Sequence, residues 1–228
     1  MDDKLLKLSP SDFAFLWEEC KRCYYLKVVC NFQRPRPIMP KIFTIIDTRM
    51  KTFYSGKRCE TISDKLPPGV VEHGERWVES QPIQLAGHAS KCYVKGKFDT
   101  VVKFDDGSYG VVDFKTSERK EEHIPLYSRQ LHAYAHALEN PAPGKFSLKP
   151  VSKLGLLIFE PQKYAQSPTS GLVGFAGSVV WREIKKDDSN FNRFLHEIMN
   201  VLELPNPPDP DENCEWCRYR NDSKKKGL

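Results

Sequence analysis

The chain has 228 residues, enough for one ordinary globular domain with short attachments. Apolar residues make up 39% and charged residues 29%, a balance typical of soluble proteins, and no apolar run approaches the roughly 20 residues that span a bilayer. The segment Met1–Lys7 lacks the long apolar stretch of a signal peptide. We therefore expect a cytoplasmic protein with no membrane contact.

The net charge of +5 is distributed unevenly along the sequence. The segment Lys21–Arg58 contains ten lysines or arginines and a single acid, Asp47, so it carries +9 and leaves −4 for the rest. Five aromatic residues are interleaved with these charges: Tyr24, Tyr25, Phe32, Phe43 and Phe53. This combination predicts a platform for single-stranded nucleic acid. A solvated charged face with its aromatic residues in the core is the alternative.

Helices are expected first along the chain. Ser9–Asp12 supplies an N-cap and a first-turn proline to a helix expected over Phe13–Leu26. The three prolines of Arg34–Pro40 must interrupt helical structure, and a second helix is expected over Lys41–Phe53. A turn follows at Leu66–Gly69.

The second part of the chain alternates strands and helices. The expected elements are a strand over Glu75–Leu85, a hairpin over Gly96–Lys115, a helix over Pro125–Leu138, a buried strand over Lys153–Glu160, a polar loop over Gln162–Gly171, a strand over Gly174–Ile184 and an amphipathic helix over Asp187–Leu204. This order predicts an α/β fold with a mixed central β-sheet flanked by helices.

The hairpin brings chemically active residues together. If Asp105–Gly107 is a three-residue loop with Gly107 in the left-handed position, Phe104 pairs with Ser108 and Asp99 pairs with Asp113. Directly opposed residues have Cβ atoms roughly 4.5–5.5 Å apart, so two carboxylates need a positive charge between them. A divalent cation suits that position, and strand alternation places Lys115 on the face of Asp113. Two acids and a lysine suit metal-dependent phosphodiester hydrolysis.

Gln130 and Tyr134 follow on the helix expected over Pro125–Leu138. Their i, i+4 spacing places both on one helix face. A surface amide and a core aromatic are the simpler explanations of the two residues when each is considered alone.

Three motifs in order, Gly96-x-x-Asp99, Asp113-x-Lys115 and Gln130-x-x-x-Tyr134, resemble those of the PD-(D/E)XK nuclease superfamily, in particular its RecB-like branch. The resemblance covers roughly residues 75 to 160 and implies a restriction-endonuclease-like core. It implies that Asp99 and Asp113 bind Mg²⁺ or Mn²⁺, with the backbone carbonyl of Phe114 as a third ligand. Lys115 corresponds to the catalytic lysine, and Gln130 and Tyr134 to substrate-orienting residues.

One departure from the RecB-like pattern concerns the metal site. RecB-like nucleases usually carry a His on a helix before the first aspartate motif, and Lys41–Phe53 contains none. Asp47 or His73 is a candidate substitute, with a plain surface position as the simpler alternative for either.

Four cysteines form the second constellation, in the pairs Cys20-Lys-Arg-Cys23 and Cys214-Glu-Trp-Cys217. The first pair is expected on one face of the first helix, and Pro205–Pro210 is a stiff linker able to return the second pair to it. Four thiolates suit zinc or an iron–sulfur cluster, and ordinary thiols are the alternative. The other cysteines, Cys30, Cys59 and Cys92, are given no role.

The segment Cys20-x-x-x-Tyr24-Tyr25-Leu26 resembles the N-terminal motif of iron–sulfur RecB-like nucleases, including those of CRISPR adaptation and of recombination helicases. Those proteins supply one early and three late cysteines. Here Ser223 stands near the position of the third late cysteine, and Cys23 is a candidate replacement. The resemblance implies a four-iron, four-sulfur cluster, with zinc as the alternative.

The expected function is metal-dependent hydrolysis of DNA, either single-stranded or at ends, in repair, recombination or CRISPR-type processing, with possible protein partners. Endonuclease and exonuclease activity both stay open. The alternative is an inactive nucleic-acid binding or assembly module with a zinc or iron–sulfur structural site. We expect a nuclease domain over residues 1–204 and a Pro-rich linker with a C-x-x-C tail over 205–228.

Overall fold

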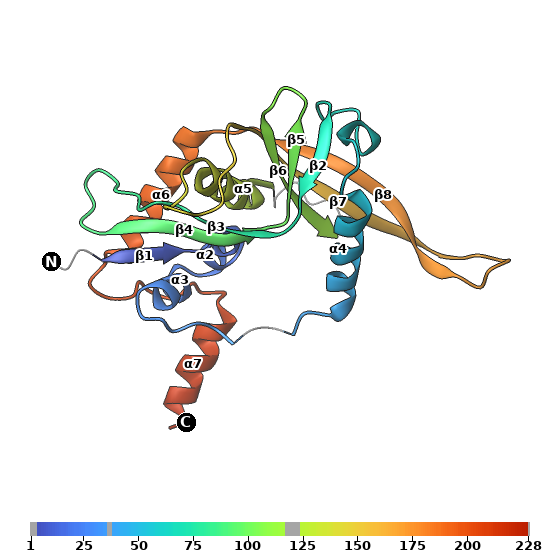
Figure 1. Cartoon of the computed structure of the whole chain (residues 1–228). Coiled ribbons are helices and arrows are strands. Elements are labelled where there is room, and N and C mark those ends of the chain that lie inside the picture. The colour runs from blue at the N-terminus through green and yellow to red at the C-terminus, as the bar shows by residue number, and fades with distance from the viewer. Residues whose placement is uncertain (1–3, 36–37, 117–123, 228) are drawn as a thin grey trace.

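The computed structural model describes residues 4–35, 38–116 and 124–227, which form both helices and strands (Figure 1). The helices are α1 (Pro10–Ala14), α2 (Leu16–Glu19), α3 (Lys21–Val28), α4 (Lys41–Tyr54), α5 (Ile124–Glu139), α6 (Asp188–Leu202) and α7 (Glu215–Lys225), with a 3₁₀ turn, η1, at Cys59–Thr61. The strands are β1 (Leu5–Leu8), β2 (Gly69–His73), β3 (Arg76–Glu79), β4 (Lys91–Phe98), β5 (Thr100–Phe104), β6 (Tyr109–Thr116), β7 (Val151–Gln166) and β8 (Val173–Ile184). The expected α/β class is confirmed. No helix among these residues is both long and apolar enough to span a membrane.

The strands form two mixed sheets that meet at one residue. The smaller sheet has the order β1-β4-β3, and the larger has the order β2-β5-β6-β7-β8. β4 ends at Phe98 and β5 begins at Thr100, so Asp99 is the residue at which the chain passes from one sheet to the other. This first aspartate therefore lies at a junction of the backbone.

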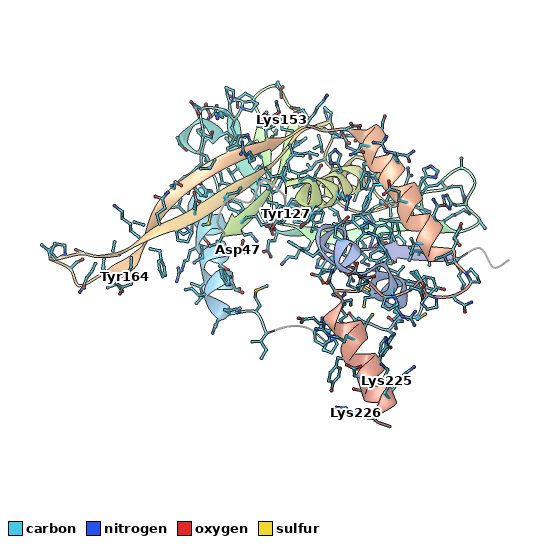
Figure 2. The ribbon with its side chains drawn as sticks, turned by 180° about the vertical axis from the view of Figure 1, so that it is seen from behind. Asp47, Tyr127, Lys153, Tyr164, Lys225 and Lys226 are labelled. Atoms are coloured by element: carbon cyan, nitrogen blue, oxygen red, sulfur yellow. The ribbon has the colours of Figure 1, made fainter. Side chains whose placement is uncertain are left out.

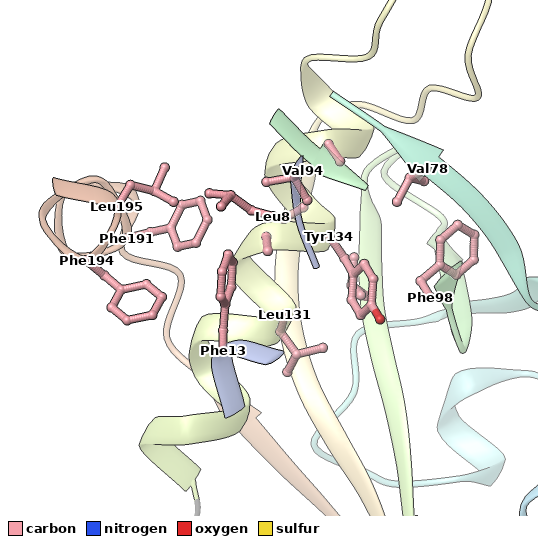
Figure 3. Close-up of a cluster of buried hydrophobic side chains, with 14 of the residues drawn as sticks. Leu8, Phe13, Val78, Val94, Phe98, Leu131, Tyr134, Phe191, Phe194 and Leu195 are labelled. Carbon is pink, nitrogen blue, oxygen red and sulfur yellow. The ribbon is translucent and has the colours of Figure 1, made fainter. Parts of the chain in front are cut away.

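The central part of the larger sheet is covered on both faces. β6 and β7 are parallel, and their crossover contains α5, which packs against α1, β4 and β7 in the main core (Figure 3). A second apolar cluster on β5, β6 and β7 includes Val102, Val112, Phe114 and Leu157, and Met50 and Tyr54 of α4 pack against it. Burial on both faces explains the continuous apolar runs of these strands.

The hairpin register follows the expected pattern. Thr100 pairs with Val112 and Lys103 with Tyr109, while the Phe104 N–H donates to the Ser108 carbonyl. Gly107 has φ +86°, the left-handed conformation that the loop requires. The facing of Asp99 and Asp113 follows from this register.

The single helix expected over Phe13–Leu26 is a wrong prediction, because three short helices occupy the segment. Phe15 separates α1 from α2, and Cys20, the N-cap of α3, has an extended backbone with φ −170° and ψ 111°. The segment has to pack against two partners. Phe13 and Trp17 contact Phe194 of α6, whereas Cys20 contacts the C-terminal cysteines. The periodicity of apolar residues does not reveal that one segment packs against two different partners.

Other boundaries also differ from the expected ones. The strand expected over Glu75–Leu85 shortens to β3, after which Ser80 and Ile83 make only isolated bridges. β7 continues to Gln166, through half of the expected polar loop, because β8 pairs with it as far as Val173. The end of this hairpin forms an arm that extends beyond the body, with Tyr164 toward its tip (Figure 2). β1, β2 and α7 were not expected at all.

Candidate metal and cysteine sites

Asp99, Asp113 and Lys115 lie together at the junction of the two sheets. Lys115 Nζ is 2.5 Å from Asp113 Oδ2, and Asp99 Oδ2 accepts a hydrogen bond from the Phe114 N–H at 3.1 Å. The hairpin register thus brings both carboxylates and the lysine into one network. We call these three residues the carboxylate site.

Asp113 is buried, with 3% of the residue exposed. Apart from the ion pair with Lys115, no hydrogen bond of good geometry reaches its Oδ2 within the described part of the chain. Burial raises the pKa of Asp113 to about 7; the charge of Lys115 lowers it and that of Asp99 raises it further. A further cation beside this carboxyl would compensate its charge and favour the ionised form.

Lys115 stays protonated in this site. Burial is the largest influence and lowers the pKa of Lys115, but the charge and hydrogen bond of Asp113 together with the charge of Asp99 outweigh it, and the net shift is upward. Its ammonium also lies 4.8 Å from the centre of the Tyr127 ring, a cation–π contact. Tyr127 lies on α5, near the middle of the molecule in Figure 2, and no sequence signal marked it.

A second positive charge, Lys51 of α4, lies between three carboxylates. Its Nζ is 2.7 Å from Asp47 Oδ2, 2.8 Å from Glu75 Oε1 and 2.8 Å from Asp99 Oδ1. Burial by itself lowers the pKa of Lys51, but the hydrogen bonds to Asp47 and Asp99 reverse the shift and raise it. The ammonium therefore compensates the clustered negative charge beside Asp99.

The two candidate substitutes for the missing His lie in different places. Asp47 shares Lys51 with Asp99, and the charge of Asp99 contributes to the raised pKa of Asp47, after the larger effect of burial. His73 instead pairs with Glu72 and packs edge-on against Phe146. Glu75, which joins Asp47 and Asp99 through Lys51, was missed because it was assigned only as the start of a strand.

Gln130 and Tyr134 lie where the i, i+4 spacing of α5 predicts. Gln130 Nε2 donates to Asp113 Oδ1 at 3.4 Å. Tyr134 is buried in the main core, with its hydroxyl turned away from the phenylalanines of α6 (Figure 3). Burial raises the pKa of Tyr134, although a hydrogen bond with Gln130 opposes the shift. Neither residue is a plain surface side chain.

Close packing explains why Gly96, the first residue of the aspartate motif, is a glycine. A Cβ at this position would lie 2.7 Å from Cδ of Pro10 and 3.1 Å from Cε1 of Tyr134. The glycine allows β4 to approach α1 and α5 closely enough for Tyr134 to reach the region of Asp99 and Asp113.

The four cysteines of the two C-x-x-C pairs converge, as expected. Their sulfurs all lie within 4.8 Å of one another, and the separations are 3.9 Å for Cys20–Cys217, 3.7 Å for Cys23–Cys214 and 3.5 Å for Cys23–Cys217. The expectation that Cys20 and Cys23 share a helix face is wrong in detail, because Cys20 precedes α3 as its N-cap. We call these four residues the cysteine cluster.

The surroundings of the cysteine cluster act unequally on its thiols, because burial raises the pKa of Cys23 and of Cys217. Burial raises the pKa of Cys20, but hydrogen bonds from the backbone of Asp211 and Cys23 outweigh it and lower the value to about 7. Arg34 Nη2 donates to Cys214 Sγ at 3.2 Å. Arg22 Nη1 donates to the Pro208 carbonyl at 2.9 Å, which ties the Pro-rich linker to α3. The linker returns the C-terminal pair to the N-terminal pair as the sequence predicts.

The basic segment Lys21–Arg58 is only partly available as a surface for a polyanion. Lys51 and Arg58 each pair with acids from other segments, and Arg34 pairs with Glu19. Of the five interleaved aromatic residues, Tyr24 and Tyr25 are buried, whereas Phe32, Phe43 and Phe53 are exposed. Arg36 lies outside the described residues. The alternative of aromatic residues in the core therefore holds for Tyr24 and Tyr25, while a nucleic-acid platform on the exposed part of the segment stays a prediction.

This mixed α/β fold with an acid–acid–lysine site is typical of metal-dependent phosphodiesterases. The sequence pattern of the PD-(D/E)XK nuclease superfamily matches residues 64–221, more than half of the chain, and the chain belongs to that superfamily. The solved structure of SSO0001 is similar with a TM-score of 0.48 and 14% sequence identity, over 97% of this chain and 85% of that chain. No curated protein matches the chain.

Proposed function

We propose that this protein is a Mg²⁺- or Mn²⁺-dependent nuclease of the RecB-like branch, which hydrolyses phosphodiester bonds in single-stranded DNA or at DNA ends. One observation carries the proposal: Asp113 is buried opposite Asp99 with its Oδ2 compensated only by Lys115 among the described residues. A charged group in that position is costly in a purely structural role. Binding of a cation by the carboxylate would offset this cost.

The donor set fits a hard divalent cation. Asp99 and Asp113 offer carboxylate oxygens, which Mg²⁺ and Mn²⁺ prefer, and the backbone carbonyl of Phe114 is the proposed third ligand. Once bound, such a cation polarises the scissile phosphate and lowers the pKa of a water molecule. The ammonium of Lys51 already occupies a position beside Asp99 at which positive charge is favourable.

The remaining residues have roles that follow from their contacts. Lys115, held protonated by Asp113, is positioned to stabilise negative charge that develops on the phosphate oxygens. Gln130 donates to Asp113 and thereby fixes the orientation of that carboxyl. Tyr134, hydrogen-bonded to Gln130, supports this orientation from the core. In this proposal Tyr134 is a positioning residue.

A second candidate function is an inactive binding or assembly module. The observation that favours it is Lys51, whose ammonium lies among Asp47, Glu75 and Asp99 as a bound cation would. If Lys51 neutralises this group permanently, a divalent cation gains little there. The two functions differ in whether Mn²⁺ binds and whether DNA is cut.

For the cysteine cluster we propose a single zinc ion in place of the expected four-iron cluster. A tetrahedral zinc site has Zn–S bonds of about 2.3 Å, so its sulfurs are about 3.8 Å apart. Three of the six sulfur–sulfur separations, at 3.5–3.9 Å, agree with this value, and all six lie within 4.8 Å. A cluster of four irons places several atoms between the thiolates and separates them further. Zinc here links the N-terminal and C-terminal segments.

The test of the nuclease proposal compares two aspartate variants. Asp113→Asn should abolish Mn²⁺-dependent cleavage of single-stranded DNA, since the neutral amide no longer binds the cation as a carboxylate does. Asp64→Asn, a matched change at an exposed position, should cleave like the wild type. Cleavage is followed on denaturing gels, and melting curves verify that both variants fold. A fully active Asp113→Asn protein would eliminate the site assignment.

A further inference from the structure

A groove lies beside the cysteine cluster, between the chain segment after α3 and the helix α7. Its volume is about 240 Å³, and its walls include Leu26, Phe32, Arg34, Trp216, Tyr219 and Arg220. Sites for drug-sized ligands have roughly 300–1,000 Å³. The groove is therefore suited to a ligand group of about the size of one nucleobase.

Aromatic side chains form much of the wall. These large hydrophobic side chains are exposed: Phe32 to 57%, Trp216 to 38% and Tyr219 to 73%. Trp216 and Tyr219 lie three positions apart on α7 and therefore on one side of that helix. Exposed aromatic faces that converge on one groove are suited to stacking with a flat ring.

Two guanidinium groups in the same groove have unused donors. Nε of Arg34 and Nε of Arg220 are both buried, and neither donates a hydrogen bond within the described residues. Arg34 uses its other nitrogens for Glu19 and Cys214, and Arg220 lies 5.9 Å from the ring of Phe32. A buried donor without an acceptor costs about 1–3 kcal/mol. Both nitrogens are closed off from solvent, so a ligand in the groove would meet the positive charge of the two guanidinium groups rather than these donors.

The lining of the groove includes two arginines and no acidic residue. In the sequence, the segment that contains Phe32 and Arg34 precedes α4, which carries Lys51. A peptide ligand accounts for the apolar walls, but it does not require two guanidinium charges in the lining. A nucleotide requires both aromatic faces and positive charge near its oxygens.

We propose that this groove binds one nucleotide of a single-stranded DNA, with its base stacked among Phe32, Trp216 and Tyr219 and with the positive charges of Arg34 and Arg220 near its phosphate or base oxygens. The proposal rests on the proposed function for the identity of the strand. It adds a binding position outside the carboxylate site, on the element that the cysteine cluster fixes in place.

The experiment measures the affinity of a fluorescein-labelled single-stranded oligothymidylate by anisotropy, in the Asp113→Asn background so that the strand stays intact. Arg220→Gln and Tyr219→Ala should each weaken binding about tenfold, because one charge-assisted contact or one stacking face is lost. The control is Arg218→Gln, which removes the same charge from the same helix but lies outside the groove lining. It should change the affinity less than twofold.

Equal affinities for Arg220→Gln, Tyr219→Ala and Arg218→Gln would overturn the proposal. If Arg220→Gln loses bound metal or melts early, the highly exposed Tyr219→Ala variant decides the question. Cleavage by the wild type with Mn²⁺ is measured in parallel. If the groove variants weaken binding but the wild type does not cleave DNA, the nuclease proposal is wrong and the groove proposal stands. If the wild type cleaves DNA but the groove variants bind as well as the control, the groove proposal is wrong and the nuclease proposal stands.

Discussion

The carboxylate site and the cysteine cluster are both polar groups inside this fold, but they are assembled over very different chain distances. Asp99 and Asp113 lie on the two arms of one hairpin, whereas Cys20 and Cys217 are 197 residues apart. A hairpin can form with little loop entropy, while joining the cysteines closes almost the whole chain. A metal bound at the distant site would therefore contribute more to folding stability than one bound at the local site.

The two groups also differ in how their surroundings shift pKa values. Burial raises the pKa of Asp113 to about 7, because the fold compensates the charge of this carboxylate only in part. In the cysteine cluster, hydrogen bonds lower the pKa of Cys20 to about 7, and Arg34 donates to Cys214. In the proposed function a cation would compensate the charge of the first group, and a metal bound by the second group would hold its sulfurs as thiolates.

The largest expected effect comes from breaking the distant site. Cys214→Ser combined with Cys217→Ser should lose zinc and lower Tm by about 10–20 °C, because the link across nearly the whole chain is removed. Cys30→Ser, at an exposed cysteine of the same N-terminal region, should retain both. Elemental analysis and calorimetry measure the two quantities. Stoichiometric iron in a brown protein would contradict the zinc proposal and favour the four-iron cluster. A wild-type protein with neither metal would mean that these residues are ordinary thiols.

An intermediate effect is expected from a change in the local site. Lys115→Gln should reduce cleavage about 100-fold or more, because a charge that stabilises the reacting phosphate is lost. Mn²⁺ affinity should change much less, and zinc content and Tm should stay near the wild-type values. Single-turnover kinetics and calorimetry separate these quantities. Loss of Mn²⁺ binding in Lys115→Gln would mean that the lysine holds the metal site together.

The smallest effect concerns pH. Because the pKa of Asp113 is raised to about 7, protons compete with the metal below that value, so Mn²⁺ affinity should rise about tenfold per pH unit up to pH 7 and then level off. Calorimetry in buffers of different ionisation enthalpy should show about one proton released per Mn²⁺ at pH 5.5 and almost none at pH 8.5. An affinity that is constant over this range would place the ionised Asp113 carboxylate outside the metal site.

Local patterns allowed much of the site to be predicted. The turn residues Asp105–Gly107 set the hairpin register, and this register determined that Asp99 faces Asp113. Helix periodicity correctly placed Gln130 and Tyr134 on one face of α5. The α/β class and the superfamily followed from the same motifs. These features depend on contacts between residues close in sequence, for which spacing is sufficient information.

Tertiary structure alone decided the contacts between distant segments. Glu75 and Lys51 join Asp99 because α4 packs against β6, and no spacing in the sequence reports that packing. Cys20 takes an extended conformation at a helix boundary to meet α7, which local propensity does not favour. The groove between Phe32 and Arg220 exists only because the cysteine cluster brings α7 back to α3. Such contacts are set by the total free energy of packing, to which each local segment contributes only a small part.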